Sequence, residues 1–125
     1  MITPVEDSAH HILLVLNPRP EGGDTYLDRL SSIVYERISM NKSKRIVFHV
    51  ISPLGRPFYI EKLRPFIQNN IGLSLTIRFH GVSPDDLEGF LKKSLGRIDS
   101  ILIERDLLEY RRVLDKHGVE YIVID

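Results

Sequence analysis

Five short apolar runs, rich in Ile, Leu and Val, are spread along this chain. They cover residues 11–17, 45–51, 73–79, 98–103 and 119–124. A run that is apolar on both faces is typical of a strand that helices cover on both sides of a sheet. The pattern therefore predicts five buried strands.

The segments between these runs have the spacing of amphipathic helices. Apolar residues return there at three- and four-residue steps, within 24–40, 57–69, 83–95 and 106–117. Pro65 lies inside the second segment and predicts a bend or break there. Strict alternation of strands and helices indicates one α/β domain over residues 1–125, with a parallel sheet, right-handed crossovers and helices on both faces.

Capping residues mark the helix ends. Ser83 offers an N-cap hydroxyl just before Pro84, a favoured first helical residue. Asp106, with Glu109 three residues later, has the spacing of a capping box, and Gly118 marks the end of the last helix. Within the strands, we expect five residues to be central and buried: Val15, Phe48, Ile77, Ile101 and Val123.

Composition and charge narrow the class of protein. Lys plus Arg and Asp plus Glu both number 17, and this balance argues against a surface dedicated to nucleic acid or to anionic membranes. The absence of cysteine excludes disulfides and thiolate chemistry, and it fits a reducing compartment. No apolar run approaches the ~20 residues of a membrane helix, and the N-terminus lacks the layout of a signal peptide. We therefore expect a cytoplasmic protein with no membrane insertion.

Ligands of an open parallel sheet bind beyond the carboxyl ends of its strands. After the first strand, a Gly-Gly turn with a helix N-terminus behind it is a candidate phosphate loop. The candidate ligand-binding residues at these strand ends are Asn17, Arg19, Gly22, Gly23, Asp24, Ser52, Arg56 and His80. The loop lacks the spacing of a dinucleotide fingerprint or a P-loop, so a loop that only begins a helix is the simpler interpretation.

Signals for catalysis are weak. The chain has no nucleophile elbow, and its histidines lack metal-ligand spacing; only His80 directly follows a predicted strand. The acids at 85–86 are explained by a helix start, and residues 104–106 are interpreted as a solvated turn. We therefore expect no enzyme activity, no metal and no cofactor.

Four segments resemble the universal stress protein family. Residues 48–53 (FHVISP) resemble its second strand and the Pro-bearing loop after it, and residues 81–84 (GVSP) resemble the glycine-x-proline step before its third helix. Residues 99–103 and 119–124 resemble its last two strands. The resemblance implies a Rossmann-like, adenine nucleotide alpha hydrolase-like sheet in the order 3-2-1-4-5, with dimerisation through the last strand.

The chain departs from the ATP-binding branch of that family. That branch carries Asp at the end of strand one and a glycine-rich signature after strand four, whereas here these positions hold Asn17 and the glycine-free segment 104–112. A backbone without glycine cannot closely approach a triphosphate. The departure therefore argues against ATP binding.

Three hypotheses follow for the function. The leading one is a universal stress protein-like regulatory or interaction domain without ATP binding. It would act as a homodimer, with Val119, Tyr121 and Val123 of the apolar last strand at the interface, or through a larger system such as a transporter. The second is a nucleotide- or phosphate-ligand-binding protein that uses the loop after strand one. The third is a receiver- or flavodoxin-like domain. Against a working receiver, this chain has no acidic cluster at the first strand and no lysine after the fifth.

Overall fold

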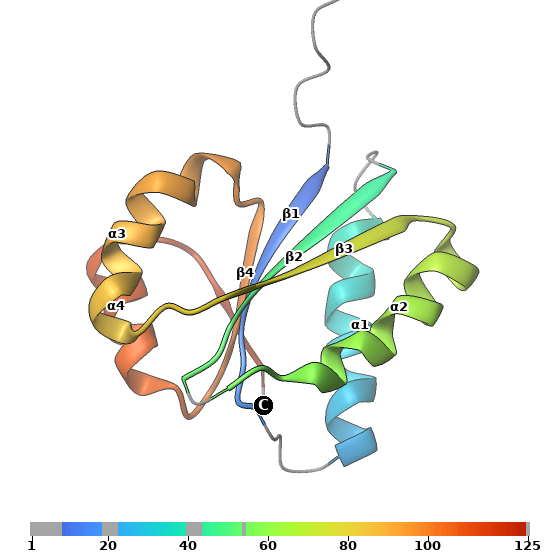
Figure 1. Cartoon of the computed structure of the whole chain (residues 1–125), viewed down its shortest axis with the longest axis horizontal. Helices are drawn as coiled ribbons and strands as arrows, with labels where there is room; N and C mark the ends of the chain where they lie inside the picture. The colour runs from blue at the N-terminus through green and yellow to red at the C-terminus, as the bar shows by residue number, and fades with distance from the viewer. Residues whose placement is uncertain (1–8, 19–22, 40–43, 54, 125) are drawn as a thin grey trace, which may run out of the picture.

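The computed structural model describes residues 9–18, 23–39, 44–53 and 55–124 (Figure 1). The strands are β1 (His10–Val15), β2 (Arg45–Ile51), β3 (Ser74–His80), β4 (Ser100–Glu104) and β5 (Ile122–Ile124). The α-helices are α1 (Gly23–Ser39), α2 (Leu63–Pro65), α3 (Pro84–Ser94) and α4 (Leu108–Lys116). Two 3-10 helices, η1 (Phe58–Lys62) and η3 (Leu95–Arg97), and one π-helix, η2 (Phe66–Ile71), complete the helical segments of the described residues. No helix in the described ranges has the length and apolar character to cross a membrane.

The five strands form one parallel sheet in the order β3-β2-β1-β4-β5, as expected. Helices α1 and α2 cover one face, and α3 and α4 cover the other (Figure 1). The chain moves from β1 through β2 to β3, and then returns past β1 to β4. The carboxyl ends of β1 and β4 therefore form the switch point at which this class of sheet binds ligands.

Two hydrophobic cores lie on the two faces of the sheet. On β1, Ile12 and Leu14 pack with α1 and α2, whereas Leu13 and Val15 pack with α3 and α4. These four side chains are fully buried, because β1 lies at the centre of the sheet and is covered on both faces. A strand that is covered on both faces needs apolar side chains on both, which explains the continuous apolar run of β1.

Three of the five predicted core residues are confirmed. Val15 and Phe48 are fully buried, and Ile101 is 5% exposed. The prediction is wrong for Ile77 and Val123, which are only half-buried. Both lie on the edge strands β3 and β5, where one neighbouring strand is missing and less of each side chain is covered.

The helix signals are confirmed at three points and wrong at one. The Asp86 N–H donates to the Ser83 hydroxyl at 3.2 Å, so Ser83 caps α3. The segment around Pro65 breaks into η1, α2 and η2. Gly118, at φ 67°, ends α4 with a bond from its own N–H to the Asp115 carbonyl. Asp106 caps nothing, because α4 begins at Leu108 after an N-cap without a side-chain bond.

Candidate functional site

A buried carboxyl group occupies the switch point. Glu104, the last residue of β4, is 7% exposed. Its Oε2 accepts a hydrogen bond from the Asn17 N–H, just beyond β1. The Tyr59 hydroxyl donates to the Asn17 carbonyl at 2.9 Å. The main-chain N–H and carbonyl of Asn17 are therefore both hydrogen-bonded within the protein.

Two tyrosines complete the cluster around Glu104. Tyr26 of α1 and Tyr59 of η1 pack edge to face with ring centroids 5.9 Å apart. Burial raises the pKa of both phenols. The Tyr26 hydroxyl is buried, and among the described residues it has no hydrogen bond of normal geometry. The cluster therefore contains a polar group with unused bonding capacity next to a carboxyl.

Burial also raises the pKa of Glu104, an effect that the hydrogen bond from the Asn17 N–H and the nearby Tyr26 hydroxyl partly oppose. The interpretation of residues 104–106 as a solvated turn is therefore wrong for Glu104, although Arg105 and Asp106 are exposed. A phosphate placed between the ends of β1 and β4 would meet this carboxyl and the exposed Asp106. Two acids therefore lie at the switch point.

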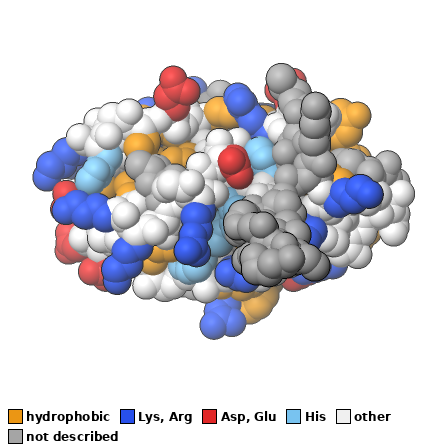
Figure 2. All heavy atoms as spheres, turned by 90° about the horizontal axis from the view of Figure 1, so that it is seen from above, with side chains coloured by type: hydrophobic (Ala, Val, Ile, Leu, Met, Phe, Trp, Pro, Cys, Tyr) orange, Lys and Arg blue, Asp and Glu red, His pale blue; other side chains and the backbone are white. Residues whose placement is uncertain are grey.

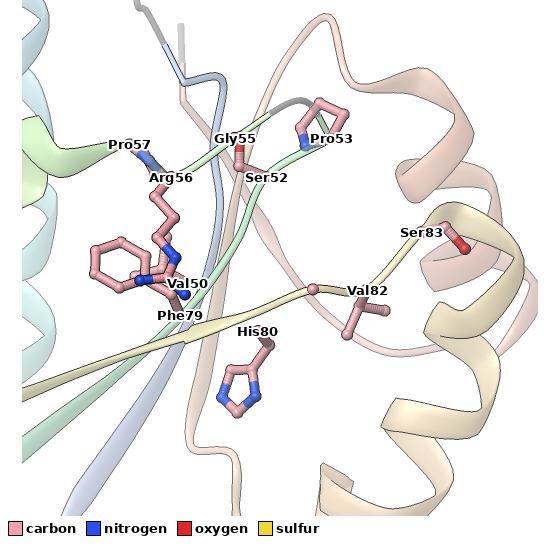
Figure 3. A pocket seen from close by; sticks show the side chains of 11 residues that line it. Val50, Ser52, Pro53, Gly55, Arg56, Pro57, Phe79, His80, Val82 and Ser83 are labelled. Carbon is pink, nitrogen blue, oxygen red and sulfur yellow. The ribbon is translucent and has the colours of Figure 1, made fainter.

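A separate pocket of about 330 Å³ lies over the carboxyl ends of β2 and β3 (Figure 3). Three predicted ligand residues, Ser52, Arg56 and His80, line it. The Arg56 guanidinium lies 5.7 Å from the centroid of the Phe79 ring, a cation–π contact. The Ser52 hydroxyl oxygen is buried and has no hydrogen-bond partner among the described residues. This pocket offers a cation, an aromatic face and an unused hydroxyl.

His80 borders the same pocket, but its imidazole ring points to the other face of the sheet. Figure 3 shows the imidazole on the opposite side of β3 from Arg56 and Phe79. There the ring forms a hydrogen bond with the His49 ring and packs against Phe90. The His80 and Phe90 ring centroids are 5.1 Å apart. Burial, and after it the charge of Arg78, lowers the pKa of His80.

Three histidines form a row across the sheet, on the face covered by α3. His11 Nδ1 lies 2.8 Å from His49 Nε2, and His49 Nδ1 lies 3.0 Å from His80 Nε2. The rings of each pair are stacked, with centroids 5.1 and 5.2 Å apart. Such a stack does not converge on one point, and no group of acids, histidines or cysteines among the described residues is arranged to hold a metal ion.

The structure divides the predicted ligand site. Asn17 is hydrogen-bonded to Glu104 at the ends of β1 and β4, whereas Ser52 and Arg56 line the pocket over β2 and β3. Gly23 begins α1 with a φ of 48°, and Asp24 follows it in the first turn. Arg19, Gly22 and the side chain of Asp24 lie outside the described residues.

The predicted interface residues on and before β5 have different surroundings. The Tyr121 hydroxyl donates to Asp115 of α4 at 2.6 Å, and Val119 packs against the core beneath α3 and α4. Val123 lies half-buried within β5 itself. Of the three, Val123 is the one that lies within β5.

Sequence reasoning missed Glu104, Tyr26, Tyr59, His11 and His49. Glu104 directly follows an unbroken apolar run, a signal that the strand continues through it. The two tyrosines carried no local signal, because η1 and α1 are far apart in the chain. In the sheet register Leu13 lies opposite His49, so their side chains share a face. His11 is two residues before Leu13 on β1 and therefore lies on that same face.

Comparisons of the chain with family models, with curated proteins and with solved structures found no match. The class that the structure defines is an α/β domain of Rossmann-like topology with the strand order 3-2-1-4-5. The resemblance to universal stress proteins stays a prediction.

Proposed function

We propose that this chain is a regulatory domain of the universal stress type that acts by association and does not bind ATP. One observation carries the proposal: the buried Glu104 carboxyl, bonded to the Asn17 N–H, stands where the ends of β1 and β4 would receive phosphates. The strand order is the one that the family resemblance implies, which adds support.

The partner that fits best is a second copy of the chain, paired through β5. This strand is last in the sheet order, so its outer backbone edge has no neighbouring strand in the described part of the chain. A hollow of about 490 Å³ lies beside it, lined by the start of β4 and by residues 119–122. An apolar edge of this kind favours pairing with another strand, and a two-fold axis would close the pairing as a dimer.

The association is tested by light scattering at tens of micromolar protein. We expect the unmodified chain to be a dimer and Val123→Lys to be a monomer with unchanged far-UV dichroism. Thr76→Lys is the matched control, because Thr76 is exposed on β3 at the opposite edge. A monomeric unmodified chain, or a Val123→Lys dimer, would contradict pairing through β5.

The absence of ATP binding is tested by thermal unfolding with saturating ATP and magnesium. A ligand at 100 times its dissociation constant stabilises the folded state by about 2.7 kcal/mol, which shifts the midpoint of a domain this size by several degrees. We expect no shift beyond error. A rise of several degrees would overturn this part of the proposal whatever the oligomeric state.

The pocket over β2 and β3 favours a second candidate function, the binding of a small phosphorylated ligand. Its volume of about 330 Å³ lies at the lower end for organic ligands, and Arg56, Phe79 and Ser52 can contact a phosphate, a ring and a hydroxyl. AMP is the probe. Stabilisation that Arg56→Gln abolishes and Arg112→Gln leaves intact would support this function, and no stabilisation by AMP would exclude AMP-type ligands.

A further inference from the structure

A cavity of about 220 Å³ lies between the sheet and the C-terminal end of α3. The histidine row contributes to its lining, together with three arginines from β2, β3 and η3. Every charged or titratable side chain that lines it is basic: His11, His49, His80, Arg45, Arg78 and Arg97. We propose that this cavity binds a small multivalent oxyanion of the phosphate or pyrophosphate type.

The three guanidinium groups supply the charge that such an anion needs. The guanidinium groups of Arg45, Arg78 and Arg97 make no hydrogen bond or ion pair with any other residue that the structure describes. Seen from the end at which the strands begin, histidine side chains lie next to basic ones near the middle of the face, and further basic side chains are spread over the rest of it (Figure 2). Guanidinium groups match phosphate oxygens with paired N–H donors, so an anion here would offset the mutual repulsion of these arginines.

The size of the cavity selects the ligand. A volume of about 220 Å³ falls below the range of pockets that enclose drug-sized organic molecules. It suits an inorganic ion or a very small phosphate ester better than a nucleotide. The ligand class therefore differs from the AMP-sized one considered for the pocket that contains Arg56.

The histidine row couples anion binding to proton uptake. Each of its two N···N hydrogen bonds holds one proton, so three neutral rings hold one further proton at an outer nitrogen. A fourth proton gives both outer nitrogens an N–H and makes the row a cation. An anion in the cavity stabilises that charged form, so affinity is expected to rise as the pH falls.

The groups that face the row are consistent with this coupling. Arg45 and Arg78 lie on β2 and β3, Arg97 lies in η3, and α3 presents Phe90 and Ser94, so the lining holds no carboxylate that would charge the row without an anion. The nearby Asp99 carboxylate accepts a bond from the His11 main-chain N–H at 2.8 Å. Burial and Arg78 both lower the pKa of His80, which opposes protonation at that end of the row when no anion is bound.

The test is calorimetric titration of the full chain with pyrophosphate, and separately with inorganic phosphate, at constant ionic strength and at pH 6 and pH 8. We expect binding that is tighter at pH 6. Arg78→Gln and Arg97→Gln should each weaken it about tenfold or more, because each removes a charge-assisted hydrogen bond. Both arginines are exposed, so these variants should fold.

The controls separate a built site from general charge attraction. Arg112→Gln removes the same charge from the exposed surface of α4 and should leave the affinity unchanged. His49→Gln interrupts the row and should reduce the difference between pH 6 and pH 8; its fold is checked by dichroism. If it does not fold, binding of sulfate to the unmodified chain decides the point, because the charge of sulfate is the same at pH 6 and pH 8 and only the protein titrates. No binding at millimolar pyrophosphate or phosphate, or equal losses in Arg112→Gln and Arg78→Gln, would overturn the proposal. This result is independent of dimerisation through β5.

Discussion

The buried carboxyl at the switch point can be tested with Glu104→Gln. The substitution keeps the size of the side chain and an oxygen that can accept the Asn17 N–H, but it removes the ionisable group. The new amide N–H can also donate to the nearby buried Tyr26 hydroxyl, which has no hydrogen bond of normal geometry among the described residues. Because burial raises the pKa of Glu104, ionising it at neutral pH destabilises the folded state. The variant should therefore be more stable than the unmodified chain at pH 8.

The size and pH window of the effect follow from proton linkage. Between pH 4.5, the reference pKa of the exposed group, and the raised pKa of the folded state, only the folded chain holds this proton. In that window the unfolding free energy contributed by Glu104 falls by about 1.4 kcal/mol for each pH unit gained. The variant lacks this slope, so its advantage should grow through the window and then stay constant above it. Titration of His10 and His80, whose pKa values are lowered, affects both proteins equally and cancels in the difference.

The assay is urea unfolding followed by far-UV dichroism, from pH 4.5 to pH 8. Asp106→Asn is the matched control, because this exposed acid lies two residues away, and it should change stability by less than about 0.5 kcal/mol. Glu104→Ala should have the opposite sign to Glu104→Gln, since it leaves the Asn17 N–H without its acceptor, at a cost of about 1–3 kcal/mol. If Glu104→Gln is less stable at pH 8 and the difference does not vary with pH, the carboxyl is ionised and stabilising, and the reasoning about the switch point is wrong.

Two further substitutions test the fold. Ile101→Ala, at a buried position of β4, should lower the unfolding free energy in urea by about 2–5 kcal/mol, and a loss below about 1 kcal/mol would mean that β4 is not central. Gly118→Ala should cost about 1 kcal/mol, since Gly118 has a φ of 67° and a Cβ there would meet no atom within 4 Å. The cost is therefore conformational alone, and an unchanged thermal midpoint would contradict the left-handed end of α4.

The sequence by itself determined the type of each element and the class of the sheet. Burial of a strand on both faces requires consecutive apolar residues, and burial of one helix face requires a three- and four-residue period, so both signals are local. Alternation of the two patterns leads to a parallel sheet with helices on both sides, which the structure confirms. The strand order rested on the family resemblance, and it is confirmed too. Local signals also placed Ser83 at the start of α3 and Gly118 at the end of α4.

Only the tertiary structure decided which polar side chains meet. His11 and His49 are 38 residues apart and His49 and His80 are 31 apart, and their contacts depend on the register of three neighbouring strands. Glu104 resembled a surface acid in the sequence, because nothing local shows that α1 and η1 close over it. Ile77 and Val123 were expected to be central, but position in a sheet is set by which strands pair, and the outer strands lack a neighbour on one side. The polar clusters of this sheet are formed by side chains from different strands. The hydrophobic pattern of the sequence reports only on neighbours along one strand or helix, so it could not show these clusters.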